Sequence, residues 1–382
     1  MQPVVTYKYR LYPRRSQIKA LLYILNVARY WYNMCLAERK YAYELEGRTV
    51  CKKDQEPLIK HYKKTFLGNK QVHSHVLQVA TNDLDKAMKK FFKWAKGKKK
   101  AGEKVGYPRF KSASRFHSFG FKEHGNGFKV IGNRLHITGV GKIPIRMHRP
   151  LPEGAVIKTI RVKYQAGQWF VSIVITKPPS KELPKTGRYV GIDVGITSLI
   201  TTSDGEKIDN PKYYGKAQKQ VKKVQRALKR KVKGSNNYKK NRTRLQRVHG
   251  HVANQRSDFL HKISTYFVQN YDGIVLEDLR ITNMVKNRHL SKSILDSGWG
   301  ILRQYLTYKA VSANRALLII NPANTSKWCS NCGCAFENFT LSTRWVECEQ
   351  CGLSLDRDHN AAINILRKGG WDAPVLGNVG GR

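Results

Sequence analysis

The sequence has few acidic residues and no long apolar run. Of its 382 residues, 26 are Asp or Glu and 71 are Lys or Arg, which gives a formal net charge of +45. A charge excess of this size attracts polyanions and binds phosphates with release of counterions. No apolar run approaches the ~18 residues of a membrane-spanning helix, and no lipid-facing helix is expected opposite the basic residues. We therefore expect a nucleic-acid partner and no membrane contact.

Cysteine is scarce outside one region, and no secretory leader is recognisable. Cys35 and Cys51 are isolated, whereas the other five cysteines lie between residues 329 and 351. This clustering indicates a metal site in a reducing compartment rather than a disulfide framework. The first residues lead into a charged strand instead of the apolar segment of a leader, so a cytoplasmic protein is expected.

The N-terminal half is expected to form a β-barrel-like unit that is interrupted by helices. Residues 4–12 alternate in polarity as a strand does, and Pro13 follows them. A helix is expected from about Ser16, an N-cap candidate, and helical spacing continues to about residue 94. Residues 106–175 carry strand signals separated by Gly and Pro, so they would complete the barrel.

The C-terminal half is expected to be a mixed α/β domain. Two strands follow a Pro-rich linker, and helices then alternate with strands. The later elements are expected as a helix pair within 211–250, helices at 252–269, 301–314 and 360–366, and strands at 273–276 and 316–320. The expected division is a barrel (1–13 and 105–178) with a helical insertion (14–104), a linker (179–186), an α/β domain (187–326 and 354–368) with an inserted cysteine module (327–353), and a flexible tail (369–382).

Acidic residues stand where strands and helices of the α/β domain meet. Asp193 lies within the apolar strand YVGIDVGI, where an unpaired charge is costly. Glu277 and Asp278 end the apolar strand GIVLED, and Asp356 and Asp358 precede the final helix. Such carboxylates could converge at one edge of a sheet. The spacing favours Glu277 over Asp278, and it leaves the choice between Asp356 and Asp358 open.

Converging carboxylates suit a hydrolytic metal site. Mg²⁺ prefers hard oxygen ligands and keeps several waters, and two ions ~4 Å apart can promote phosphodiester hydrolysis. Each acid alone also has a structural explanation. Asp358 could cap the helix that follows it, and Glu277 could pair with a lysine. Their joint placement in so basic a chain favours the metal site.

The cysteines have the spacing of a four-thiolate zinc site. Cys329-x2-Cys332 and Cys348-x2-Cys351 are separated by fifteen residues, and a glycine follows each pair. Four thiolates complete a tetrahedral shell, so the expected Zn²⁺ is structural rather than catalytic. Cys334 is expected to stay outside this shell.

Five segments carry a family resemblance through their order and spacing: GIDVGITSLI, IVLEDLRITNM, TSKWCSNCG, CEQCG and DRDHNAAINIL. Together with KYRLYP and YPRFKS nearer the N-terminus, they make residues 4–368 resemble the TnpB family, transposon-encoded relatives of the type V CRISPR effector nucleases. The resemblance implies a multidomain α+β protein. A wedge β-barrel with an inserted helical recognition domain would precede a RuvC-like, RNase H-type α/β nuclease domain. The four-Cys zinc finger, inserted in the nuclease domain, would bind target nucleic acid.

The resemblance also implies a function and a set of site residues. A protein of this family would bind a guide RNA from the end of its transposon and cleave double-stranded DNA beside a short transposon-adjacent motif. The carboxylates of the family map onto Asp193, Glu277 and Asp358, the last because it stands directly before xNAA. They would hold Mg²⁺, or Mn²⁺ in its place. The chain would act as a monomer at a bacterial or archaeal nucleoid.

Guided recognition leaves sequence reading to base pairing, while the protein contacts backbones and the adjacent motif. Residues 211–250 hold fifteen Lys or Arg and no acidic residue, so i,i+4 ion pairs cannot neutralise them. A solvated surface is the structural alternative for all these side chains. The candidate contacts are His75, Gln78 and Asn82 on one helical face, Lys98, Lys99 and Lys100 in a Lys/Gly-rich stretch, and Lys222, Lys223, Arg226 and Arg230 in the basic run.

Two other functions are compatible with the composition. A binding protein that never cuts would use the same basic surface, but the complete carboxylate set disfavours it. A conventional transposase would join DNA strands without RNA, and the resemblance disfavours it because TnpB proteins accompany a separate transposase. A metal-dependent cleavage assay separates the first alternative, and RNA-independent strand transfer would reveal the second.

Overall fold

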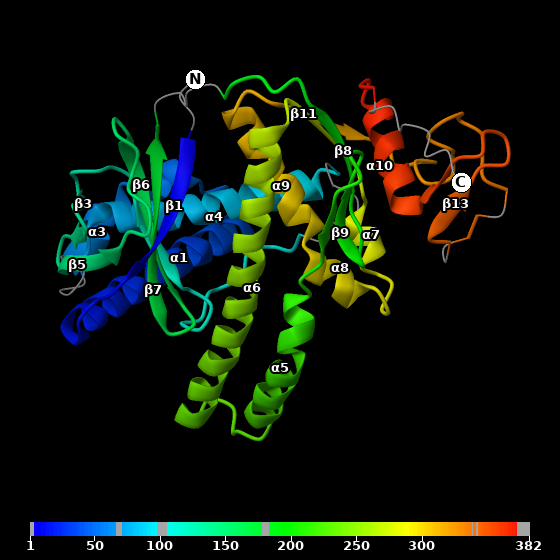
Figure 1. Ribbon diagram of the computed structural model, residues 1–382. Coiled ribbons are helices and arrows are strands. Elements are labelled where there is room, and N and C mark those ends of the chain that lie inside the picture. The colour runs from blue at the N-terminus through cyan, green and yellow to red at the C-terminus, as the bar shows by residue number, and fades with distance from the viewer. Residues whose placement is uncertain are drawn as a thin grey trace. The chain divides into compact units, whose positions relative to one another are not determined.

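A computed structural model describes residues 4–65, 71–97, 105–177, 183–337, 339–340 and 343–372 (Figure 1). They fall into two units, Met1–Pro179 and Ser180–Arg382, each built on its own hydrophobic core. Within the described ranges, no helix combines the length and the apolar character needed to cross a bilayer.

The first unit is built on a seven-stranded antiparallel sheet in which the N-terminal strand lies in the middle. The strand order is β2-β6-β7-β1-β5-β4-β3, so strands from later in the chain flank β1 on both sides, as expected. In the described part of the chain, the edge strands β2 and β3 pair with one neighbour each, so the sheet is a half-barrel and not a closed barrel. The strands are β1 (Val4–Leu11), β2 (Ser118–Phe121), β3 (Phe128–Ile131), β4 (Arg134–Ile137), β5 (Gly141–Arg146), β6 (Val156–Gln165) and β7 (Gln168–Thr176).

Between β1 and β2, the described residues form four helices. The expected N-cap of the first helix was wrong, because Ser16 lies inside the first turn. The N–H of Arg14 is bonded instead to the side-chain oxygen of Gln17, at 3.0 Å. Trp31 of α1 donates its indole N–H to the Thr81 hydroxyl of α4 at 2.8 Å, which joins the two long helices inside the core. The helices are α1 (Arg15–Glu46), α2 (Lys52–Gln55), α3 (Leu58–Thr65) and α4 (Ser74–Ala95).

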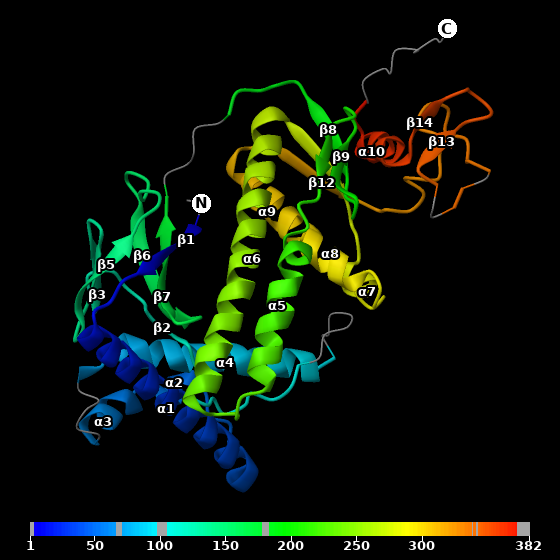
Figure 2. The ribbon, with the colours of Figure 1, turned by 60° about the horizontal axis from the view of Figure 1, so that its bottom comes forward.

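The second unit has a mixed five-stranded sheet with helices on both faces (Figures 1 and 2). Its order is β10-β9-β8-β11-β12. The strands β8, β11 and β12 are parallel, and β9 and β10 run antiparallel to their neighbours. Helices α6 and α9 pack on one face, and α10 covers the other. The elements are β8 (Tyr189–Asp193), β9 (Ser198–Thr202), β10 (Lys207–Asp209), α5 (Tyr213–Lys229), α6 (Asn236–Asn270), β11 (Gly273–Glu277), α7 (Ile281–Met284), α8 (Ser291–Ser297), α9 (Trp299–Ser312), β12 (Ala316–Ile320), β13 (Trp345–Glu347), β14 (Ser354–Asp356) and α10 (Arg357–Lys368).

The basic run forms a helical hairpin that extends further along the chain than expected. We predicted a separate helix at 252–269, but the single helix α6 continues through both segments and pairs with α5 (Figure 2). The boundary at residue 250 was wrong because one glycine within a helix costs only about 1 kcal/mol. The C-terminal half of α6 is held in the core by Leu260 and Phe267, both fully buried.

Candidate carboxylate and thiolate metal sites

Two acidic residues lie side by side because β8 and β11 are parallel neighbours. The register pairs Ile192 with Leu276, so the next residues, Asp193 and Glu277, end their strands at the same edge. Successive strand residues face opposite sides of a sheet. Ile192 and Leu276 pack into the core with α6 and α9. Asp193 and Glu277 therefore face the side that α10 covers.

The helix α10 approaches β8 closely and brings a third acidic residue to this edge. A Cβ at Gly191 would lie 2.1 Å from the carbonyl oxygen of Ala362, so only glycine permits the packing. The helix begins at Arg357, three residues earlier than expected. Asp358 therefore lies within the first turn of α10 and does not precede the helix.

The structure gives Asp356 and Asp358 different roles. Asp356 is the N-cap of α10, because its Oδ1 accepts the backbone N–H groups of Asp358 and His359 at 3.0 and 3.1 Å. Its other oxygen pairs with Lys207 at 2.8 Å. Burial opposes ionisation of Asp356, but the bond to Lys207 and the backbone N–H groups lower its pKa. Asp356 is thus occupied by structural contacts, which leaves Asp358 as the candidate metal ligand.

The surroundings of Asp193 disfavour its charged form. Burial, then the charges of Glu277 and Asp358, raise the pKa of Asp193 to about 8, although Arg357 opposes the shift. Burial also raises the pKa of Glu277. Bound divalent cations are often the largest local charge and reverse this balance. Mg²⁺ and Mn²⁺ both take carboxylate oxygens, so these three residues are the ones that could hold either cation. Among the described residues, their oxygens are not gathered as closely as the four cysteine sulfurs.

Two neighbouring side chains hold the carboxylates, and sequence reasoning missed both. The Thr325 hydroxyl donates to Glu277 Oε1 at 2.5 Å. The Arg357 guanidinium donates from Nε and Nη2 to Asp358 Oδ1, at 3.1 and 3.0 Å. In the sequence, both residues could have been noticed only because they lie next to recognised motifs: Thr325 is the first residue of TSKWCSNCG, and Arg357 directly precedes Asp358. Asp278, by contrast, forms an ion pair with Arg303.

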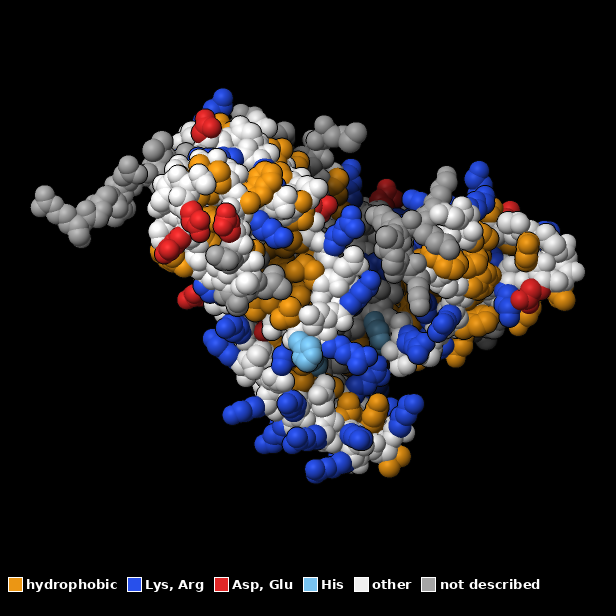
Figure 3. All heavy atoms as spheres, turned by 90° about the vertical axis from the view of Figure 1, so that its right-hand side faces the viewer, with side chains coloured by type: hydrophobic (Ala, Val, Ile, Leu, Met, Phe, Trp, Pro, Cys, Tyr) orange, Lys and Arg blue, Asp and Glu red, His pale blue; other side chains and the backbone are white. Residues whose placement is uncertain are grey.

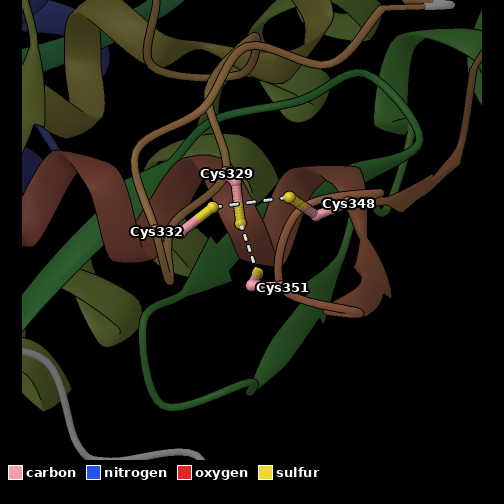
Figure 4. Close-up of side chains that lie close together, drawn as sticks. All are labelled: Cys329, Cys332, Cys348 and Cys351. Carbon is pink, nitrogen blue, oxygen red and sulfur yellow. Dashed lines mark hydrogen bonds between the residues drawn. The ribbon is translucent and has the colours of Figure 1, made fainter.

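The four expected cysteines converge (Figure 4). Their sulfurs all lie within 4.8 Å of one another. The Sγ atoms of Cys329 and Cys351 are 3.6 Å apart, and those of Cys332 and Cys348 are 3.4 Å apart. Zinc–sulfur bonds of ~2.3 Å in a tetrahedron separate the sulfurs by about 3.8 Å. The observed distances are close to this value, so the four cysteines fit a structural Zn²⁺. Within the described ranges, no other set of three or more His, Cys, Asp or Glu side chains is gathered this tightly.

Backbone turns present the thiols of each pair. Gly333 and Gly352 have φ angles of 78° and 67°, and their N–H groups bond to the carbonyls of Cys329 and Cys348 at 3.0 and 2.8 Å. Burial opposes ionisation of Cys351, but N–H donors, including that of Leu353, lower its pKa to about 6. A thiolate is the form that binds zinc. Cys334 lies outside the cluster.

The expected nucleic-acid contacts have different surroundings. On α4, the side chains of His75, Gln78 and Asn82 are half-buried, and His75 lies edge-on to the His73 ring, so this face is not simply solvated. The expected contacts Lys98, Lys99 and Lys100 lie outside the described residues. Lys222, Lys223, Arg226 and Arg230 are exposed on the hairpin of α5 and α6.

Family models match three parts of the chain. A model described as "Probable transposase" matches residues 172–288, and one described as "Cas12f1-like, TNB domain" matches residues 299–365. A "Helix-turn-helix domain" model matches residues 5–48. In this chain the last segment holds β1 and the single long helix α1.

Relatives cover nearly the whole chain. A protein of Streptomyces pristinaespiralis named "Putative RNA-guided DNA endonuclease" is 38% identical over 370 residues, which cover 95% of this chain and 89% of that protein. InsQ of Escherichia coli carries the same description and is 29% identical over 97% of this chain and 93% of its own. A "TnpB-like protein" of Acanthamoeba polyphaga mimivirus is 26% identical over 59% of this chain and 46% of its own. The chain belongs to the TnpB family.

One solved structure shares the fold of this TnpB-family chain. It is described as a cryo-EM structure of a Cas12f1–sgRNA–target DNA complex. It superposes with a TM-score of 0.58 at 16% sequence identity, covering 92% of this chain and 82% of that one. The Cas12-like multidomain fold expected from the motifs is therefore confirmed at this level.

Proton competition should make cation binding at the carboxylates of this TnpB-family chain depend on pH. Because the pKa of Asp193 is raised to about 8, its protonated form dominates below pH 8, and a cation must displace that proton. We expect the apparent Mn²⁺ affinity to rise up to about tenfold per pH unit from pH 6 to 8 and then to level off. Electron paramagnetic resonance of free Mn²⁺ measures this. Asp193→Asn should bind Mn²⁺ weakly, with an affinity that does not change with pH over this range. If the affinity of that variant still rises with pH as in the parent chain, the competing proton is carried by another group.

Proposed function

We propose that the chain is an RNA-guided DNA endonuclease encoded by a transposon. It would bind a guide RNA from the end of the element and cleave target DNA beside a short adjacent motif. Two observations carry this proposal. Asp193 and Glu277 end neighbouring strands at one sheet edge, with Asp358 in the first turn of the helix that packs there, and relatives of the chain bear the name RNA-guided DNA endonuclease. The likeness to a Cas12f1 structure supports the fold but not the partners.

The domain arrangement is part of the proposal. The order and directions of the strands β8 to β12, with acids on β8 and β11, support a RuvC-like, RNase H-type nuclease domain at 187–326 and 354–368. The thiolate cluster supports a zinc finger at 327–353 that binds target nucleic acid. The half-barrel at 1–13 and 105–178 would be the wedge, and the helices of 14–104 the recognition domain. The chain would act as a monomer.

The side chains at the sheet edge would divide the work as follows. Asp193, Glu277 and Asp358 would hold the cations through carboxylate oxygens. A pair of Mg²⁺ or Mn²⁺ ions held there would supply an activated water and stabilise the charge that develops on phosphate oxygens. Thr325 keeps Glu277 oriented. Arg357 supplies positive charge to Asp358 in the metal-free protein.

The hairpin of α5 and α6 offers a surface for phosphates. Figure 3 shows Lys and Arg side chains gathered over its projecting end. Val221 and Val224 point into the hairpin and are buried, which directs the neighbouring Lys222, Lys223 and Arg226 to solvent. In the described part of the chain, the side chains of these three residues and Arg230 form no ion pair with an acidic residue, so their charge is available to nucleic acid.

Neutralising this surface should weaken nucleic-acid binding more at low salt than at high salt. Changing the four residues to Gln should lower the slope of log affinity against log salt by about 0.7 to 0.9 for each phosphate that the variant no longer neutralises. Filter binding from low to high salt measures the slope. Lys129, Arg134, Lys142 and Arg146, exposed on β3, β4 and β5, give a control set with the same loss of charge. Equal effects of the two sets would indicate net charge rather than local contacts.

Guide exchange tests the proposed function as a whole. The chain is co-expressed with its flanking DNA, the RNA that copurifies is sequenced, and its guide portion is replaced. We expect cleavage of a plasmid library to follow the new guide and to require both a divalent cation and one short flanking motif. Strand transfer without RNA would indicate a conventional transposase instead, and binding without cleavage would indicate a regulator.

A further inference from the structure

One segment of the chain contacts both candidate metal sites. Residues 321–330, here the connecting segment, run from the end of β12 to the first zinc-binding pair. Thr325 lies in this segment and is 3% exposed. Its hydroxyl donates to Glu277 Oε1 at 2.5 Å and lies 3.2 Å from the Pro322 carbonyl oxygen. A buried hydroxyl in this position fixes which carboxylate oxygen of Glu277 remains available to a cation.

The helix that carries Asp358 holds the same segment. Asn360 is fully buried, donates to the Trp328 carbonyl at 2.8 Å and accepts the Ser330 N–H at 2.8 Å. One turn later, Asn364 donates to the carbonyls of Thr325 and Trp328 at 2.8 and 2.7 Å. Two asparagines of α10 therefore bond to three backbone groups of the connecting segment.

The zinc site anchors the far end of the connecting segment. Ser330 lies between Cys329 and Cys332, so the backbone that Asn360 grips is part of the first cysteine pair. Cys329 is 1% exposed. Zinc would link this pair to the second pair, Cys348 and Cys351. It would thereby hold Ser330 and Trp328 at the positions where their backbone groups bond to Asn360. Without the ion, this link between the two cysteine pairs is lost.

We propose that the zinc site and the carboxylate site are coupled through the connecting segment, so that zinc raises the affinity of the carboxylates for their divalent cation. Thr325 and Asn360 are the positioning residues, one acting on Glu277 and the other on the helix of Asp358. The inference rests on the proposed function, since it presupposes a cation at the carboxylates. Side chains that orient metal ligands typically contribute about 10- to 100-fold to metal affinity, and coupling between two binding sites is reciprocal.

Removing one hydroxyl tests the first half of the coupling. The RNA-free full chain, loaded with zinc, is titrated with Mn²⁺ and the free ion is followed by electron paramagnetic resonance. Thr325→Val keeps the shape of the side chain and should weaken Mn²⁺ binding about 10-fold or more, whereas Thr325→Ser should bind like the parent. Thr307→Val is the matched control, because that hydroxyl donates to a backbone carbonyl in α9, at 2.7 Å from the oxygen of Arg303.

Zinc removal in two backgrounds tests the second half. Cys332→Ser, freed of zinc, should bind Mn²⁺ more weakly than the zinc-loaded parent. In the Thr325→Val background, Cys332→Ser should lower the Mn²⁺ affinity only a little further. The two losses should not add up, because both changes interrupt the same chain of contacts. Metal analysis reports zinc content, and circular dichroism reports folding. If Cys332→Ser does not fold, zinc is stripped from the parent and from Thr325→Val with a chelator before the Mn²⁺ titration, and an equal loss of affinity in both chains would overturn the coupling.

The outcomes separate the coupling from the proposed function. If the parent chain binds Mn²⁺ at a site that Asp193→Ala does not remove, the carboxylate site itself is refuted. If Asp193→Ala removes binding but Thr325→Val binds as tightly as the parent, the coupling is wrong and the nuclease proposal stands. Fully additive losses from Thr325→Val and Cys332→Ser would likewise overturn the shared route.

Discussion

Replacing Asp193 with Ala should abolish DNA cleavage and leave RNA and DNA binding largely unchanged. Asp193 ends the central strand β8 beside Glu277, and it is not one of the exposed basic side chains of α5 and α6 proposed to contact phosphates. A divalent cation stabilises the charged transition state by several kcal/mol, so loss of a ligand should slow cleavage on the order of 10³-fold or more. Single-turnover cleavage of a guide-matched plasmid measures the rate.

The variant should fold at least as well as the parent chain without metal. Burial and two neighbouring acids raise the pKa of Asp193, so the charged side chain is unfavourable there when no cation is bound. Thermal unfolding therefore distinguishes a defect in chemistry from a defect in structure. Asp258→Ala is the control, because that carboxylate is 67% exposed on α6 and pairs with Lys262 one turn along the same helix. Cleavage within tenfold of the parent in Asp193→Ala would remove this residue from the site.

Strand periodicity explains why the sequence could place two of the candidate acids at one sheet edge. An acid at the end of each of two apolar strands, Asp193 and Glu277, could be placed at one sheet edge because parallel neighbours end together. The third candidate acid, Asp356 or Asp358, could not be chosen from the sequence pattern. Spacing alone could not separate Asp356 from Asp358, since both lie near the start of a helix. Only the cap geometry shows that Asp356 is bonded to two backbone N–H groups.

Tertiary contacts account for what the sequence did not predict. Thr325 acts on Glu277 across 48 positions, and Asn360 reaches Trp328 across 32. Neither separation leaves a periodic signal, so the connecting segment could not be recognised before the fold was known. The prediction of a barrel was incomplete for a similar reason, because strand spacing along the chain does not say whether β2 and β3 meet. The continuous helix α6 shows that one glycine is weak evidence for a boundary.

Replacing Cys348 with Ser should release zinc and unfold the cysteine module while the five-stranded sheet persists. In its described residues, the module holds the three-residue strand β13, which pairs with β14 just beyond the module, and Val346 is the buried residue of these two strands. So small a core cannot offset the entropy of ordering the segment. Zinc binding to comparable peptides contributes about 10 to 16 kcal/mol at pH 7, so a zinc ion held by the four thiolates would supply most of the folding free energy of the module.

Two measurements and one matched variant decide this prediction. Metal analysis should fall from one zinc per chain to none, and limited proteolysis should cut within residues 327–353 before it cuts the sheet. Cys334→Ser is the control, because this cysteine lies in the same loop but outside the thiolate cluster, and it should retain both zinc and protection. If instead Cys334→Ser loses the ion while Cys348→Ser keeps it, the ligand set is wrong. If Cys348→Ser loses zinc but stays protected, the side chains of the module hold its fold without the metal.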